Sequence, residues 1–183
     1  TSQARKVSRR QLTRIAKKMQ RAQIVEFLGT LAQVLGLNIS SSPPEEYRAS
    51  SWDQLRRYEA QGLRVGCHAK SHFTFNALTD DEVAAELAHS KQRLACELAN
   101  PSEVFCYPSG KENDFSARHL PMVRESGFIA AVSTLSKNTS TRAVKVNPYC
   151  IERIGMPQDL GHFARFISWF EYLRGRLSNN SGS

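Results

Sequence analysis

Apolar residues recur at helical spacing through the first part of the chain. The i, i+3, i+4 pattern predicts one long helix over about residues 8–36, ending near Gly36. Its apolar positions are Leu12, Ile15, Met19, Ala22, Leu28, Leu31 and Leu35. The Ser/Pro segment 40–44 then ends regular structure, because proline cannot continue a hydrogen-bonded ladder. A shorter helix follows, with Ser50 or Ser51 as its N-cap, and extends to Gly62.

Short apolar runs alternate with helical patterns in the rest of the chain. The runs predict strands at residues 63–67, 104–107, 128–132 and 150–154. A capping box at residues 79–82 predicts a helix that continues to Leu98, and a second helix is expected over 114–126. A last amphipathic helix is expected over 160–173. This alternation predicts an α/β fold in which helices cover parallel strands.

Charge is concentrated at the N-terminus. The chain has 25 basic and 17 acidic residues, a net charge of +8. Eight basic residues and no acidic one lie in residues 1–21: Arg5, Lys6, Arg9, Arg10, Arg14, Lys17, Lys18 and Arg21. Such a segment can bind nucleic acid or anionic lipid, but no aromatic residue is interleaved to stack on bases. We therefore expect the solvated face of a helix, no nucleic-acid partner and, because no apolar run approaches about 20 residues, no transmembrane segment.

The four cysteines do not form a metal or redox motif. They are widely separated, and no CxxC pair occurs among Cys67, Cys96, Cys106 and Cys150. Three of them lie in predicted strands, where a free cysteine packs as a small core residue. We expect reduced thiols.

Two histidines four residues apart are the best candidates for chemistry. His68 and His72 follow the predicted strand 63–67, at the strand end where α/β folds place ligands. Two imidazoles at this spacing can hold a transition metal, and a metal would make the chain a candidate hydrolase. Spacing alone favours two ordinary surface histidines over a metal site, so the choice between them depends on the surrounding residues.

Several blocks around this pair resemble, in order, the C-terminal part of the polysaccharide deacetylase family over residues 47–157. The blocks are residues 51–55, Gly62 and 66–68, the His-x-x-x-His core 68–72 followed by 78–80, the Phe-Cys-Tyr-Pro-Ser-Gly segment 105–110, the junction 125–128, and the Arg-Ile pair at 153 and 154. The resemblance implies a partial or distorted (β/α) barrel with parallel strands, preceded here by the long N-terminal helix. It divides the chain into a basic helix and linker (1–46), the deacetylase-like domain (47–177) and a flexible tail (178–183).

The resemblance also implies a reaction. Members of the family hold zinc or a similar divalent metal in an Asp-His-His site and remove N-acetyl groups from amino-sugar polysaccharides. His68 and His72 would be the two imidazole ligands, and the backbone N–H of Tyr107 would stabilise the oxyanion. Pro108 and Gly110 would shape the turn that follows and contribute to substrate binding.

The chain departs from the family pattern where the carboxylates belong. The Thr-Phe-Asp-Asp motif that supplies the aspartate ligand and the base has no counterpart before His68. Asp53 is the one aspartate there, and its place in the first turn of a helix explains it. Phe73 replaces the usual proline after the second histidine, and Glu103 stands where an arginine is common. His162 fits a Leu-x-His pattern but is expected to be a surface histidine.

Two interpretations follow from the missing motif. Either the chain is the C-terminal portion of a longer deacetylase and is inactive alone, or it is a catalytically inactive carbohydrate- or partner-binding domain of the same fold. A third interpretation, binding to nucleic acid or a membrane surface through residues 5–21, has the least support.

Overall fold

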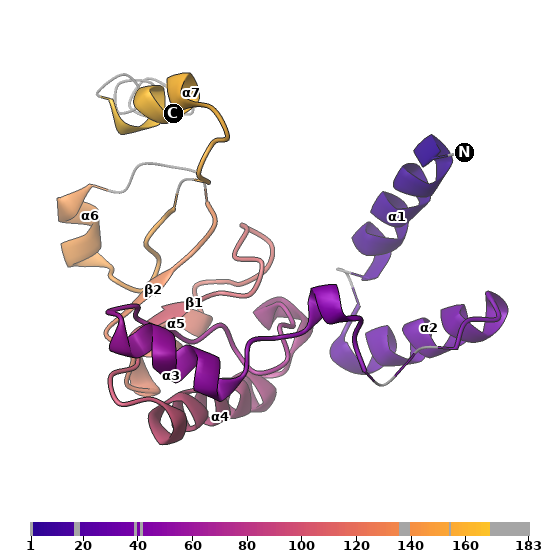
Figure 1. The fold of residues 1–183 in the computed structure, drawn as a ribbon, viewed down its shortest axis with the longest axis horizontal. Coiled ribbons are helices and arrows are strands. Elements are labelled where there is room, and N and C mark those ends of the chain that lie inside the picture. The colour runs from indigo at the N-terminus through magenta and orange to yellow at the C-terminus, as the bar shows by residue number, and fades with distance from the viewer. Residues whose placement is uncertain are drawn as a thin grey trace.

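The computed structural model describes residues 2–16, 19–38, 40, 42–135, 140–153 and 155–168. Within these ranges the chain folds into helices around a short parallel sheet (Figure 1). The helices are α1 (Ser2–Ala16), α2 (Arg21–Val34), α3 (Trp52–Ala60), α4 (Asp80–Glu97), α5 (His119–Glu125), α6 (Thr141–Val146) and α7 (Leu160–Ile167). Single 3-10 turns occur at η1 (Glu45–Tyr47) and η2 (Phe75–Ala77).

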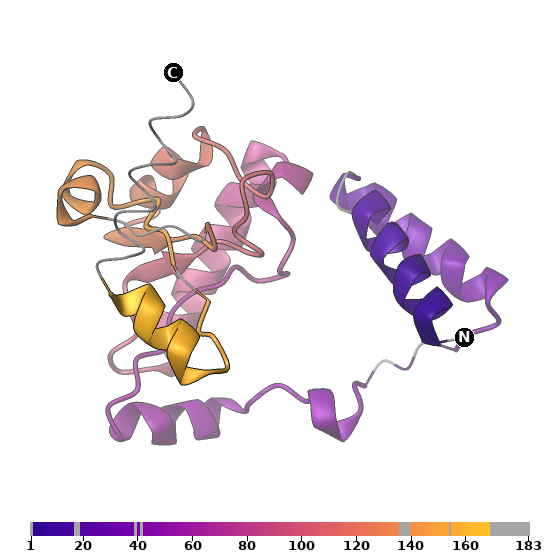
Figure 2. The same ribbon diagram turned by 90° about the horizontal axis from the view of Figure 1, so that it is seen from above.

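The predicted long N-terminal helix is two helices. Gln20 has an extended backbone and forms a capping box with Gln23, whose side chain accepts the Gln20 N–H at 2.9 Å. This local bond starts α2 afresh, so the chain changes direction between α1 and α2 although the apolar spacing continues across the break. Figures 1 and 2 show the pair standing apart from the other helices.

The two helix starts predicted downstream are confirmed, with Ser51 rather than Ser50 as the N-cap of the first. The Ser51 hydroxyl accepts the N–H of Gln54 at the start of α3, and the Thr79 hydroxyl accepts the N–H of Glu82 at the start of α4. Arg56 of α3 then reaches the far end of α4 and pairs with Glu97 at 2.7 Å. These caps confirm the predicted helix starts, because capping depends on residues only three apart.

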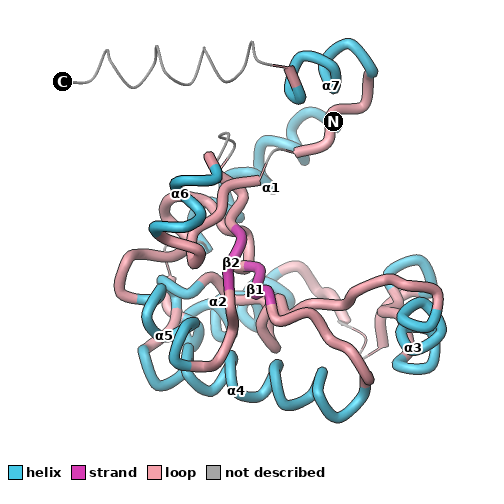
Figure 3. The backbone as a smooth tube through the Cα atoms, turned by 90° about the vertical axis from the view of Figure 1, so that its left-hand side faces the viewer, coloured by secondary structure: helices cyan, strands magenta, loops and turns pink. Residues whose placement is uncertain are grey.

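The sheet is parallel, as expected, but much smaller than a barrel. β1 (Val104–Cys106) pairs with β2 (Ala130–Val132), with Phe105 opposite Ala131. The predicted outer strands are each reduced to one parallel bridge, Cys67 to Phe105 and Val132 to Ile151. Two strands are therefore present in the described residues, flanked by α4 and α5, and the barrel is not confirmed (Figure 3).

The C-terminal half differs from prediction in its helices. α5 begins at His119 rather than near residue 114, since the backbone N–H of Ser116 donates to His119 instead of entering a helix. Pro121 then falls in the first turn, where a missing N–H costs nothing. α6 was not predicted, and residues 169–183, including the predicted tail, lie outside the described residues.

The core lies between the sheet and α4. Four aromatic residues of the core form two stacked pairs. The ring centroids are 4.0 Å apart in Tyr107 and Phe115 and 5.5 Å apart in Phe75 and Phe105. Four further buried residues are Val83, Leu87, Val123 and Ala131. All four cysteines are free thiols. Among the described residues, no helix combines the length and apolarity needed to cross a membrane.

Candidate active site

The imidazoles of His68 and His72 converge on one point. His68 Nδ1 lies 2.7 Å from the carbonyl oxygen of Cys106, so Nδ1 carries the proton and donates to it. Its Nε2 is thereby left as an electron-pair donor, 3.1 Å from Nε2 of His72. Two nitrogens bound to one tetrahedral zinc would be about 3.3 Å apart, since Zn–N bonds are about 2.0–2.1 Å. The observed separation of 3.1 Å is close to this value.

Glu86 of α4 holds the loop that carries the pair. Its carboxylate, only 4% exposed, accepts the N–H groups of Lys70 at 2.7 Å and Ser71 at 2.8 Å, and the Ser71 hydroxyl at 2.7 Å. Ala69 and His72 have φ of +61° and +59°, a conformation that costs non-glycine residues energy and needs support from its surroundings. Sequence reasoning missed Glu86, which lies 14 positions beyond His72.

The same carboxylate connects the loop to the N-terminal helices. Burial of Glu86 opposes ionisation, but the hydrogen bonds from Ser71 and Lys70 outweigh it and lower the pKa of the carboxyl group. Arg21, the first residue of α2, lies 3.5 Å from Glu86 and places its guanidinium over the Phe73 ring. Glu86 is therefore an anion that fastens the loop on one side and α2 on the other.

Tyr107 is a core residue. It is fully buried, its backbone N–H donates to Val132 at 3.1 Å, and its hydroxyl donates to the Tyr149 carbonyl at 3.0 Å. The N–H expected to face an oxyanion is thus engaged in the sheet. Pro108, which follows, is also fully buried.

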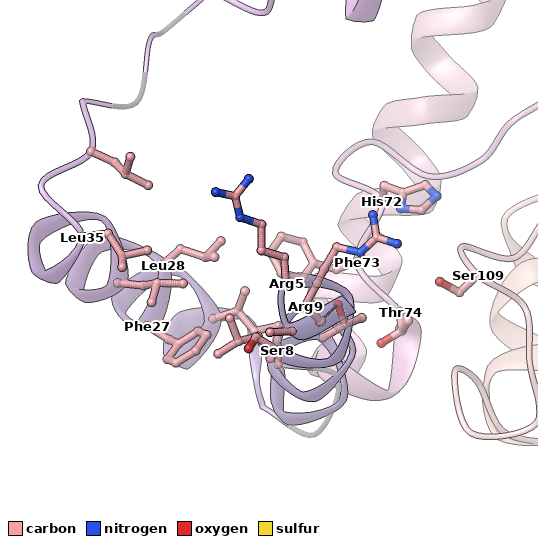
Figure 4. Close-up of a pocket in the computed structure, with 17 residues that line it drawn as sticks. Arg5, Ser8, Arg9, Phe27, Leu28, Leu35, His72, Phe73, Thr74 and Ser109 are labelled. Carbon is pink, nitrogen blue, oxygen red and sulfur yellow. Dashed lines mark hydrogen bonds between the residues drawn. The ribbon is translucent and has the colours of Figure 1, made fainter. Parts of the chain in front are cut away.

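The N–H of Ser109, two residues after Tyr107, is not engaged in the sheet. Ser109 has φ +57°, and its N–H has no acceptor among the described residues. Ser109 lines the same groove as His72 (Figure 4). The sequence signal that could have indicated this N–H is the Pro-Ser-Gly turn, because many turns lack the hydrogen bond that closes them.

Gly110 closes this turn in a conformation suited to glycine. Its φ is +68°, and an added Cβ would lie 3.0 Å from Thr134 N and 3.1 Å from Tyr107 O. Its carbonyl accepts the Thr134 N–H at 2.8 Å, which links the turn to the end of β2.

We expect Gly110→Ala to lower the free energy of unfolding by about 1–3 kcal/mol, because backbone atoms block the methyl group and φ is positive. Urea unfolding measures the change. Gly29→Ala is the control, since no atom lies within 4 Å of its Cβ and it sits inside α2, where alanine should stabilise by about 0.5–1 kcal/mol. Effects of the same sign at both positions would contradict this account of the turn.

Arg153 brings a positive charge to Cys106, whose carbonyl oxygen accepts a hydrogen bond from His68. Its Nη2 lies 3.1 Å from Cys106 Sγ, and its Nε donates to the Ser133 carbonyl at 2.8 Å. Burial raises the pKa of the Cys106 thiol, but His68 and Arg153 together bring it below its ordinary value. The expected final strand thus contributes a guanidinium beside His68, 85 positions from it in sequence.

The remaining candidates lie elsewhere. Asp53 pairs with Arg56 at 2.6 Å on the surface of α3, and His162 is bonded to Asp159 at the start of α7. His89 is exposed on α4, and His119 is buried in the core. Within the described part of the chain, no group of three or more His, Cys, Asp or Glu side chains could hold a metal. The described residues therefore bring together two candidate ligands, His68 and His72, without a third.

Comparison with known proteins agrees with this fold. The structure is similar to that of the Streptococcus pyogenes deacetylase PplD in complex with acetate, with a TM-score of 0.59 and 16% sequence identity. The match covers 68% of this chain and 53% of that one, so the chain spans about half the length of that deacetylase. No curated protein matches the sequence significantly.

The sequence itself matches a family model described as polysaccharide deacetylase over residues 30–128. This match starts in α2, earlier than the expected residue 47, and ends at 128 rather than 157. It includes the histidine pair and the turn at residues 107–110, and it covers more than half of the 183 residues. The chain belongs to the polysaccharide deacetylase family.

Proposed function

We propose that this chain carries the imidazole half of the metal centre of an N-deacetylase that acts on an amino-sugar polysaccharide. The observation that carries the proposal is the 3.1 Å approach of the two Nε2 atoms, with His68 held in the tautomer that leaves its Nε2 free. The family match and the acetate in the related deacetylase support removal of an acetyl group.

His68 and His72 would hold a divalent metal such as zinc. When bound, such a metal polarises the acyl oxygen and lowers the pKa of water. Ser109 N–H, rather than the engaged Tyr107 N–H, would donate to the acyl oxygen, while Pro108 and Gly110 keep the turn in place. The third ligand and the general base must come from outside the described residues, since no described carboxylate joins the pair.

A second function is favoured by that missing carboxylate. A domain with two metal ligands and no base would bind acetylated saccharide, or a partner, without hydrolysing it. Acetate release from chitin-like oligomers in the presence of zinc separates the two functions. Saccharide binding without release would support the binding domain.

Zinc titration tests the metal site itself. We expect His68→Ala or His72→Ala to weaken zinc binding by at least about tenfold, because one imidazole alone holds the metal poorly. The control is His89→Ala, which removes an exposed histidine from α4. Wild-type protein that takes up no zinc at micromolar concentration, or equal affinity in all variants, would refute the site.

A further inference from the structure

A large groove separates the N-terminal helices from the histidine loop (Figure 4). It has a volume of about 1080 Å³, at the upper end of the range for ligand pockets. One wall is α1 and α2, and the other holds His72, Phe73, Thr74 and Ser109. We call this the α1–α2 groove.

The lining of the groove along α2 is apolar. It consists of Ile24, Phe27, Leu28, Leu31, Leu35 and Leu37. Leu28, Leu35 and Leu37 remain 49%, 57% and 59% exposed, and neither helix has a buried residue. Contiguous exposed apolar surface of this kind marks a place where another molecule binds.

Two arginines give the groove its charge. Arg5 and Arg9 of α1 both line it, and at i, i+4 spacing their side chains are neighbours that repel each other. Neither forms an ion pair with any described residue. In Figure 4 the Arg9 guanidinium extends toward His72 and Phe73. An anion bound between the two guanidinium groups would remove their repulsion.

We propose that the α1–α2 groove binds one molecule of an anionic amphiphile, an alkyl chain that ends in a phosphate. The chain would lie along the apolar face of α2, and the phosphate would accept hydrogen bonds from Arg5 and Arg9. The head group would then lie at the end of the groove that holds His72 and Ser109. This site depends on neither the metal nor hydrolysis.

Other ligand classes fit the groove less well. A neutral saccharide leaves both guanidinium groups unpaired, and a free phosphate leaves the apolar lining exposed. Nucleic acid would use the arginines but needs aromatic platforms for its bases. Phe27 and Phe73 are the two aromatic carbon rings among the lining residues, and the Arg21 guanidinium already lies over Phe73.

The test is calorimetric titration of the full chain with dodecyl phosphate below its micellar concentration. We expect saturable one-to-one binding, at least about tenfold weaker for Arg5→Gln/Arg9→Gln, because each guanidinium–phosphate contact is a charge-assisted hydrogen bond. The matched control is Arg10→Gln/Arg14→Gln, which removes the same charge from α1 at the same spacing but from positions that do not line the groove. Circular dichroism verifies that all variants keep their helices.

Three results would overturn the proposal. The first is an equal loss of dodecyl phosphate affinity in the two double variants. The second is binding of dodecyl maltoside or inorganic phosphate as tight as that of dodecyl phosphate. The third is binding to phosphatidylglycerol vesicles alone, which would indicate that the helices bind a membrane surface. His68→Ala, which removes the other proposed metal ligand and does not line the groove, should still bind dodecyl phosphate without metal. Binding there, without acetate release by the wild type, would leave this site standing while the proposed function fails.

Discussion

Glu86→Gln is expected to weaken zinc binding by about 10- to 100-fold, although residue 86 touches no metal. One carboxylate oxygen accepts the N–H groups of both Lys70 and Ser71 within 2.8 Å, and the amide oxygen of glutamine could accept them only without the charge that strengthens both bonds. The amide NH2 would then replace the oxygen that faces the Arg21 guanidinium. The loop would lose the support for its positive φ at Ala69 and His72, and the two Nε2 atoms would no longer be held together.

The same substitution should also cost about 2–3 kcal/mol of folding stability, because buried donors lose a charged acceptor. Zinc calorimetry and urea unfolding measure the two effects. Glu112→Gln, an exposed matched change, should alter neither. Val123→Ala should lower stability through a cavity in the core but leave zinc affinity unchanged. If Glu86→Gln behaves like Val123→Ala, Glu86 has a structural role and does not position the ligands.

The protein is expected to lose about 3 kcal/mol of stability as the pH falls from about 6.5 to about 4, through His119 alone. Burial is the main cause that lowers the pKa of His119 to about 4; Arg118 adds to the lowering and Asp80 opposes it. Between about pH 6.5 and pH 4, the unfolded chain, in which the pKa is near 6.5, therefore binds a proton at His119 that the folded chain does not bind. Stability from this residue is complete above pH 6.5 and decreases until about pH 4.

The geometry explains why His119 stays neutral. Its Nδ1 accepts the Ser116 N–H at 3.0 Å, so the proton sits on Nε2, which has no hydrogen-bond partner among the described residues. A second proton would oppose the Ser116 N–H and place a charge beside the Phe75 ring, whose centroid is 5.5 Å away.

Urea unfolding at pH 4, 5, 6 and 7 measures the effect. His119→Gln keeps an acceptor for Ser116 and should remove most of the pH dependence in this window. His89→Gln, on the exposed face of α4, should keep the wild-type profile. Equal slopes for wild type and His119→Gln would contradict a buried neutral imidazole.

Sequence prediction succeeded where the deciding contacts are local. The starts of α3 and α4 follow from capping residues three positions apart, and the parallel sheet follows from alternating strands and helices. It failed at residues 8–36, because helical periodicity continues through Gln20 and does not reveal a break made by one side-chain cap. The outer strands predicted at 63–67 and 150–154 are single bridges, since β-propensity cannot supply a neighbouring strand.

The candidate site divides in the same way. By itself, the sequence determined the family, the histidine pair and the absence of its carboxylate motif, because these depend on residue identity and short spacing. Only the tertiary structure decided that the two Nε2 atoms lie 3.1 Å apart, that Glu86 holds the loop and that Arg153 reaches Cys106. It also decided that the Tyr107 N–H is bonded in the sheet, whereas the Ser109 N–H has no acceptor among the described residues. The bonds that set this arrangement join residues far apart in the chain, such as His68 to Cys106 and Lys70 to Glu86, and such residues meet only when the whole domain folds.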